Sequence, residues 1–306
     1  EKQREALTFA GRVFVRETLA STESSPWTAA LELASARLEA DYRHKKVRAH
    51  IEVDAASGKV KTKDAFAELD LPHGLTLRAG AFRQPTSAIE STGATTLPTV
   101  DRGFGSSIYS DGLEISGRRT GAVLGWKPKH LAGFKIVAGA FQWQTAAGDT
   151  QPGLVTQGLG LNALVRAEQK IRHGVEVSAW ASTRRPHDVN GALVKRRWAA
   201  GVNLELNFDK VCGPRAWVEF ASGSSALDAS PASNAVPHFI SARSIAAWRF
   251  GARDGHAWFI EPFVAGTLLD ANVADSGDML LEGALGVNVG RWQRWRLQVQ
   301  GETRSI

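Results

Sequence analysis

One polar segment carries the residue types from which serine hydrolases are built. Ser224, Ser225, Asp228 and His238 are close in the sequence, and hydrolysis needs a serine that a histidine activates and an acid orients. No flanking motif marks either serine as a nucleophile. The sequence therefore predicts that the chain is not an enzyme.

The motifs that could hold a cofactor or a metal are also weak. Residues 158–163 match a relaxed dinucleotide fingerprint, but that motif requires a strand before it and a helix after it. Here it lies inside an alternating, strand-like segment. The eight histidines are scattered without metal-ligand spacing, and the single Cys212 allows neither an internal disulfide nor a zinc cluster. We therefore predict no cofactor and no bound metal.

Arginines that alternate with apolar residues are the best functional candidates. They are Arg48, Arg78, Arg118, Arg166, Arg197, Arg243 and Arg296. Acidic residues occupy the same positions in the alternation: Glu52, Asp64, Glu68, Glu114, Glu168, Glu205, Glu219 and Glu302. Such charges on one face either line a water-filled passage and set its ion preference, or brace neighbouring strands as cross-strand ion pairs. Both interpretations are open, and the mixture of signs does not favour anions strongly.

The elements that carry these charges are strands, because apolar and polar residues alternate with a period of two. In the segment 46–55, for example, Val47 and Ile51 alternate with Arg48 and Glu52. About fifteen segments show this pattern: 6–20, 29–42, 46–55, 60–71, 74–83, 111–126, 133–144, 155–169, 173–183, 194–208, 214–222, 238–250, 256–269, 278–290 and 293–304. Most are long enough to cross a bilayer as tilted strands.

Connections between the segments differ in length in a regular way. Short ones fall near 44–45, 73–74, 173–174, 210–214, 252–255 and 290–293, and the longest are 84–110 and 223–237. Short turns at one end and long loops at the other are typical of outer-membrane barrels. The sequence therefore predicts one transmembrane antiparallel β-barrel of about sixteen strands over residues 1–306.

Composition agrees with this prediction. No run of about twenty apolar residues is present, so no transmembrane helix is encoded. The net charge of +6 is spread along the chain, which disfavours binding to nucleic acid. Aromatic residues beside the short connections are placed as an interfacial girdle would be: Trp126, Phe208, Trp248, Phe250, Trp258, Trp292 and Trp295.

An odd number of strands is unusual, because closed bacterial barrels almost always have an even number. The alternation of loop lengths places the end of the fifteenth segment on the long-loop side. A sixteenth strand is therefore expected, and we interpret the end at Ile306 as a truncation.

Between Leu38 and about Gln144 the sequence resembles the phosphate-selective porin O/P family. The segments that carry the resemblance are 36–42 (ARLEADY), 50–54, 60–70, 74–85 (GLTLRAGAFRQP), Glu90, Asp101–Gly103 and 111–117. The resemblance implies a barrel of about sixteen strands, often trimeric, whose long third loop folds inward to narrow a pore. Phosphate selectivity requires a dense cationic lining, and the mixed charges argue against it here.

Together these observations predict a bacterial outer-membrane porin that passes small hydrophilic solutes or ions with weak selectivity. The residues expected to line the pore or its constriction are Arg48, Arg78, Arg83, Arg102, Glu114, Arg118, Arg166 and Arg197. The expected partners are outer-membrane lipid, small solutes or anions, and either a homotrimer or other envelope proteins. Two alternatives are a non-conducting structural barrel within a larger envelope complex and a soluble all-β protein.

Overall fold

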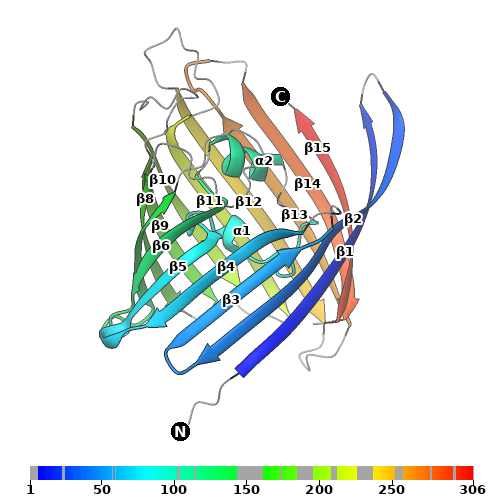
Figure 1. Ribbon diagram of the computed structural model, residues 1–306. Helices are drawn as coiled ribbons and strands as arrows, with labels where there is room; N and C mark the ends of the chain where they lie inside the picture. The colour runs from blue at the N-terminus through cyan, green and yellow to red at the C-terminus, as the bar shows by residue number, and fades with distance from the viewer. Residues whose placement is uncertain are drawn as a thin grey trace.

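In the computed structural model, the described residues form fifteen antiparallel strands, which follow one another in a single sheet that curls into a barrel (Figure 1). Each strand pairs with its neighbour in the sequence. The structure describes residues 6–22, 25–56, 58, 60–100, 102, 104–113, 115–142, 161–172, 174–184, 196–207, 212–225, 237–251, 258–275, 278–291 and 294–305. The predicted all-β barrel is confirmed.

Strand bounds agree closely with the predicted segments. The strands are β1 Ala6–Thr22, β2 Ser25–His44, β3 Val47–Asp54, β4 Lys61–Asp70, β5 Leu75–Arg83, β6 Arg118–Trp126, β7 Phe134–Gln142, β8 Leu161–Arg172, β9 Val175–Arg184, β10 Arg197–Asn207, β11 Gly213–Ser224, β12 His238–Gly251, β13 Trp258–Asp270, β14 Met279–Arg291 and β15 Trp295–Ser305. The helical turns are Pro72–Gly74, α1 Ala88–Ser91, α2 Phe104–Ser107 and Ile108–Gly112.

The predicted strand 111–126 begins too early. A π-helical turn covers Ile108–Gly112, and regular pairing starts only at Arg118. Leu113 and Ile115 imitate strand alternation, but both are buried inside the barrel, where they pack with Tyr109 against side chains of the wall. Their spacing reflects the packing of a loop.

The alternation of the sequence produces an inside-out arrangement. Along β13, Trp258 and Ile260 point outward and are exposed, whereas Phe259 and Glu261 point inward and are buried. Large apolar side chains on the outer face remain open, with Phe9 77% and Leu285 69% exposed. An apolar exterior around a charged interior is the arrangement that a bilayer stabilises.

Aromatic residues of the predicted girdle lie on the outer face near the short turns. Those that the structure describes, namely Trp126, Trp248, Phe250, Trp258 and Trp295, are all exposed. The rings of Trp258 and Trp295 meet edge to face at 5.0 Å. Phe208 and Trp292 lie outside the described residues.

A tight turn joins β4 to β5 at one of the predicted short connections. His73 and Gly74 have positive φ angles of 61° and 78°. A Cβ on Gly74 would lie 2.2 Å from the carbonyl oxygen of Lys127, so only glycine fits this close approach.

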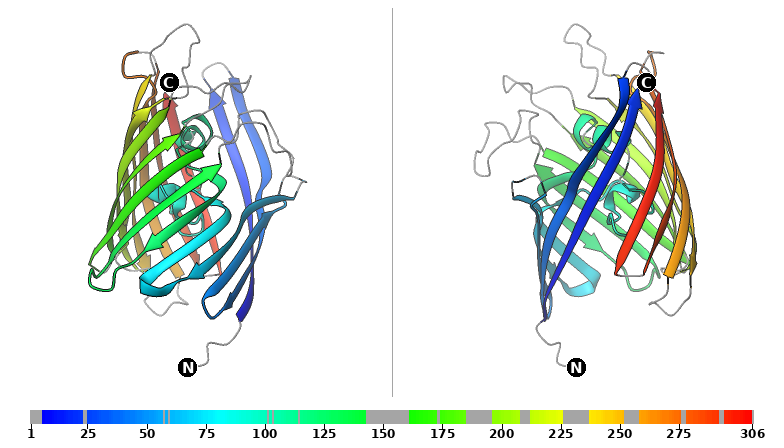
Figure 2. Two further views of the ribbon diagram at one scale, coloured as in Figure 1. Left: turned by 60° about the vertical axis from the view of Figure 1, so that its left-hand side comes forward. Right: turned by 90° about the vertical axis from the view of Figure 1, so that its right-hand side faces the viewer.

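β1 and β15 are the edges of the sheet. Among the described residues, backbone pairing joins β1 only to β2 and β15 only to β14. Figure 2 (right) shows the two edge strands running along the same side of the barrel. The sixteenth strand stays a prediction.

The described residues of the segment between β5 and β6, 84–117, fold into the barrel, and we call this segment the inward loop. Figures 1 and 2 show α1 and α2 inside the ring of strands. Ala88, Ile89 and Leu97 of this loop pack against Trp217 and Ile245 of the wall. The predicted inward third loop is therefore present.

Candidate pore constriction

Side chains of β8 to β15 form hydrogen bonds with the backbone of the inward loop. Amide and guanidinium groups of the wall donate hydrogen bonds to the carbonyl oxygens of the loop, so these oxygens are satisfied although they lie inside the barrel. The contacts are Asn203 Nδ2 to Thr86 (2.8 Å), Arg166 Nη1 to Thr86 (3.3 Å), Arg215 Nη2 to Thr96 (2.5 Å), Arg296 Nη1 to Leu97 (2.8 Å), Arg296 Nη2 to Ala94 (2.9 Å) and Asn288 Nδ2 to Pro98 (2.8 Å).

A buried charge cluster fixes the start of the loop. Arg243 of β12, 2% exposed, donates to Glu90 Oε1 at 3.0 Å and to the Arg102 carbonyl at 2.9 Å. Glu219 of β11 accepts from Ser87 Oγ and from the Ile89 amide, both at 2.6 Å. Removing one partner of a buried charge pair strongly destabilises the folded protein, because the other charge stays buried without a counter-charge. This cluster therefore anchors the loop.

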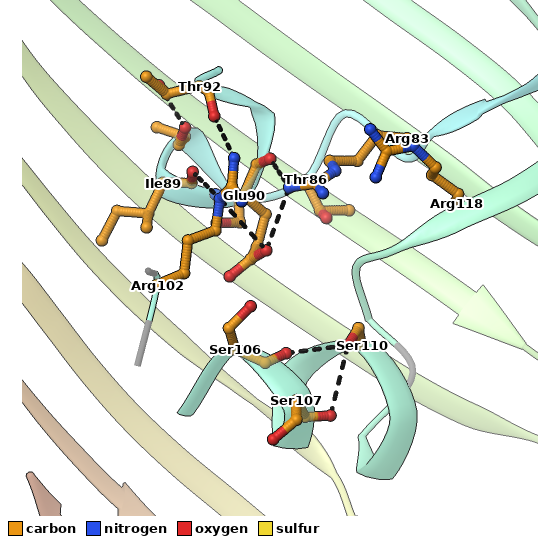
Figure 3. Close-up of polar contacts among 12 residues, drawn as sticks. Arg83, Thr86, Ile89, Glu90, Thr92, Arg102, Ser106, Ser107, Ser110 and Arg118 are labelled. Carbon is orange, nitrogen blue, oxygen red and sulfur yellow. Dashed lines mark hydrogen bonds and ion pairs between the residues drawn. The ribbon is translucent and has the colours of Figure 1, made fainter. Parts of the chain in front are cut away.

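Arg102 and Tyr109 add contacts from the loop itself. Arg102 Nε donates to the carbonyl oxygen of Ile89 at 3.1 Å and Nη2 to that of Thr92 at 2.5 Å (Figure 3). The Tyr109 hydroxyl donates to Ser241 Oγ of β12 at 2.7 Å. Burial raises the pKa of the Tyr109 phenol, so the hydroxyl keeps its proton and its role as donor.

A group of charged side chains on the opposite wall forms ion pairs within the wall. This group, which we call the Glu52 network, comprises Arg12, Arg37, Glu39, Glu52, Asp54, Lys63, Asp64 and Arg118 on β1 to β4 and β6. Arg12 is 2.9 Å from Glu39 and 2.5 Å from Glu52, and Arg118 is 2.9 Å from Asp64. Arginines here are 17–24% exposed.

A second charged patch lies closer to the short turns on the same wall. Arg48 pairs with Asp41 at 2.6 Å, and Arg78 pairs with Glu68 at 2.6 Å. Both guanidiniums also lie over the ring of Phe66, at 5.5 and 4.6 Å from its centroid. These contacts fix the two arginines while leaving them partly exposed.

The structure separates the predicted site residues into groups. Arg83 and Arg118 lie beside each other (Figure 3), and Arg83 donates to the Glu90 carbonyl. Arg48 and Arg78 form the second patch, whereas Arg166 holds the loop. Arg197 starts β10, paired in register with Arg184. Glu114 lies outside the described residues.

Sequence reasoning missed Arg12, Arg37, Glu39 and Asp54. The signal was available, because Arg12 alternates with exposed Gly11 and Val13, and Arg37 and Glu39 flank exposed Leu38. The first strands were predicted correctly, but the charged residues on their inward face were not included among the candidate site residues.

The serine, histidine and glycine motifs singled out in the sequence lie only partly within the described residues. His238 Nε2 lies 2.9 Å from Ser222 Oγ, a different serine from the two candidates, and Asp228 is not among the described residues. Residues 158–160 of the glycine motif are likewise not described. Across the described ranges no cluster of three metal-ligating side chains occurs, and no described helix is long and apolar enough to cross a membrane.

No protein-family model matches the chain, and no curated protein sequence matches it. Solved structures do. The anion-selective porin from Comamonas acidovorans has a TM-score of 0.67 at 13% identity, covering 98% of this chain and 89% of that one. The chain has the outer-membrane porin fold. Outer-membrane expressed OmpT of Vibrio cholerae (TM-score 0.62, 10% identity, 100% and 88% covered) and Salmonella typhi OmpF in complex with daunomycin (0.58, 11%, 98% and 97%) share this porin fold.

Proposed function

We propose that this protein is a bacterial outer-membrane channel for the passive diffusion of small hydrophilic solutes, with weak charge selectivity. The observation that carries the proposal is the division of the lumen. The inward loop is anchored to β8 to β15 and, through Arg83, to β5, whereas the partly exposed charges of the Glu52 network on β1 to β4 and β6 pair within the wall. A polar passage between the loop and this wall needs no chemistry, because solutes move down their own gradients.

The balance of charges supports weak selectivity. In the Glu52 network, arginine and lysine side chains alternate with carboxylates, so the described part of this wall presents no uninterrupted cationic surface. Phosphate selectivity, which the resemblance to the O/P family would imply, needs such a surface. The finer family assignment is therefore not part of the proposal.

Planar-bilayer conductance of the detergent-purified protein tests the proposal. Steady single-channel steps, with a small reversal potential under a salt gradient, are the expected result. A protein that inserts into the bilayer and never conducts would overturn it.

Anchoring of the loop across the lumen favours one second candidate, a structural barrel of a larger envelope complex. Buried hydrogen bonds hold the loop near its start at Ser87 and nearer its end at Tyr109, as they would hold a plug. This candidate predicts no single-channel current and envelope proteins that purify with the chain.

We also extend the proposal to a homotrimer. One solved structure of Vibrio cholerae OmpT, 11% identical to this chain, is described as a trimer form. The mass of the protein in detergent, measured by light scattering with the detergent contribution subtracted, should equal three chains.

A further inference from the structure

Glu52 of β3 is surrounded by guanidinium groups from three other strands. Its Oε2 lies 2.5 Å from Arg12 Nη2 of β1, and its Oε1 lies 2.9 Å from Arg37 Nη1 of β2 and 3.5 Å from Arg118 Nη2 of β6. One carboxylate therefore serves as a shared counter-charge for three arginines. The arginines have one further carboxylate each, namely Glu39, Asp54 and Asp64.

Glu52 is more deeply buried than the arginines that surround it. Its side chain is 5% exposed, whereas those of Arg12, Arg37 and Arg118 are 23%, 17% and 24% exposed. The three arginine side chains are therefore more accessible to water than the carboxylate that they share. An ion in the lumen experiences the arginines together with the negative charge of Glu52.

Glu90 of the inward loop is a second carboxylate with three arginine partners, but its partners have a different role from those of Glu52. Glu90 contacts Arg83, Arg102 and the buried Arg243, so its pairs fix the loop to the wall. Within the part of the chain that the structure describes, the ion pairs of Glu52 all lie in the wall. Loss of the charge at position 52 therefore changes the electrostatics of the passage without releasing the loop.

We infer that Glu52 determines the charge preference of the passage by offsetting the arginines of β1, β2 and β6. The inference rests on the channel function proposed above. Without this carboxylate the wall gains one net positive charge. A unit charge roughly 10 Å from an ion in water shifts cation and anion energies in opposite directions, so the anion-to-cation permeability ratio should rise roughly four-fold.

The test is the reversal potential of single channels in a potassium chloride gradient, for the wild type and Glu52→Gln. The expected result is similar conductance with the reversal potential shifted toward that of chloride. Glu52→Asp should keep the wild-type value, and Glu52→Gln combined with Arg118→Gln should return to it. If the channels conduct and Glu52→Gln leaves the reversal potential unchanged, the inference is wrong but the proposed channel function stands. If the wild-type protein carries no current, the proposed function is wrong as well.

Two further variants keep the test decisive. Glu32→Gln removes one charge from an exposed pair with Arg16, beyond the part of β2 that pairs with β3, and should leave the potential unchanged. An equal shift in this control would contradict a local effect of Glu52. If Glu52→Gln does not fold, Arg118→Gln alone should shift the potential toward that of potassium by a similar factor. No shift in Arg118→Gln would overturn the inference.

Discussion

At the scale of single residues, Arg243 is expected to contribute strongly to stability. It is 2% exposed and meets the carboxylates of Glu90 and Glu219 at 3.0 and 3.7 Å. Arg243→Ala leaves both carboxylates buried without this partner, which should cost roughly 3–5 kcal/mol. Urea unfolding in detergent should show this loss, and bilayer recordings should show a larger, noisier conductance because the loop is released.

Arg304→Ala is the matched control for that variant, because Arg304 also pairs with glutamates but is 43% exposed. Exposed ion pairs contribute about 0–1 kcal/mol. Equal destabilisation by the two variants would contradict an anchoring role for Arg243.

Tyr109 is expected to make the stability of the protein depend on pH in the alkaline range. Burial raises the pKa of its phenol above the usual value of 10.0, so the folded state holds this proton more tightly than the unfolded chain does. The stability that depends on the neutral phenol is fully present below pH 10 and is lost as pH rises further. Melting temperatures from pH 8 upward should therefore fall more steeply above pH 10 in the wild type than in Tyr109→Phe. Parallel curves would show that the phenol does not contribute.

At the scale of elements, β5 depends on one glycine. Gly80 has a φ of 135°, and an added Cβ would lie 2.2 Å from the carbonyl oxygen of Ala65 on β4. Gly80→Ala should destabilise the barrel by roughly 1–3 kcal/mol through backbone strain. Gly301→Ala is the control, since its Cβ would meet nothing within 4 Å. The temperature at which the folded, faster-migrating band is lost on a gel should be lower for Gly80→Ala than for Gly301→Ala. Equal temperatures would contradict the expected backbone strain at position 80.

The elements also show how far the sequence could predict this structure. Alternation located all fifteen strands, because strand residues face either lipid or lumen and each face selects its own residue type. It failed at Leu113 and Ile115, which alternate because one loop packs inside the barrel. Period-two reasoning cannot separate these cases, since the partners of these residues lie far away in the sequence.

The candidate site was less predictable for the same reason. Position in the alternation predicted that the side chains of Arg166 and Arg118 face inward, but not what they contact. Arg166 reaches the carbonyl oxygen of Thr86, and Arg118 reaches Asp64 of β4. Which arginine holds the loop and which faces the passage depends on where the inward loop lies, and the local sequence does not encode that position.

At the scale of the whole molecule, the inside-out arrangement predicts opposite responses to a new charge on the two faces. Val264 on the outer face of β13 is 57% exposed, and Val264→Lys should cost roughly 2–4 kcal/mol near the middle of the bilayer. Thr76→Lys places the same charge on the lumen side of β5, near Asp70, and should be tolerated. Folding yields into lipid vesicles measure both, and equal yields would contradict the assignment of the faces.

The anchoring of the inward loop also has a consequence for the order of assembly. Every strand pairs with its sequence neighbour, so the wall can form hairpin by hairpin from nearby segments. The loop is different, because Arg296 is separated by 199 residues from Leu97 and by 202 residues from Ala94, whose carbonyl oxygens it holds. Contacts between such distant segments form slowly. The loop therefore remains without these partners until β15 has arrived, and a nascent barrel passes through a stage in which its lumen is wider than in the finished protein.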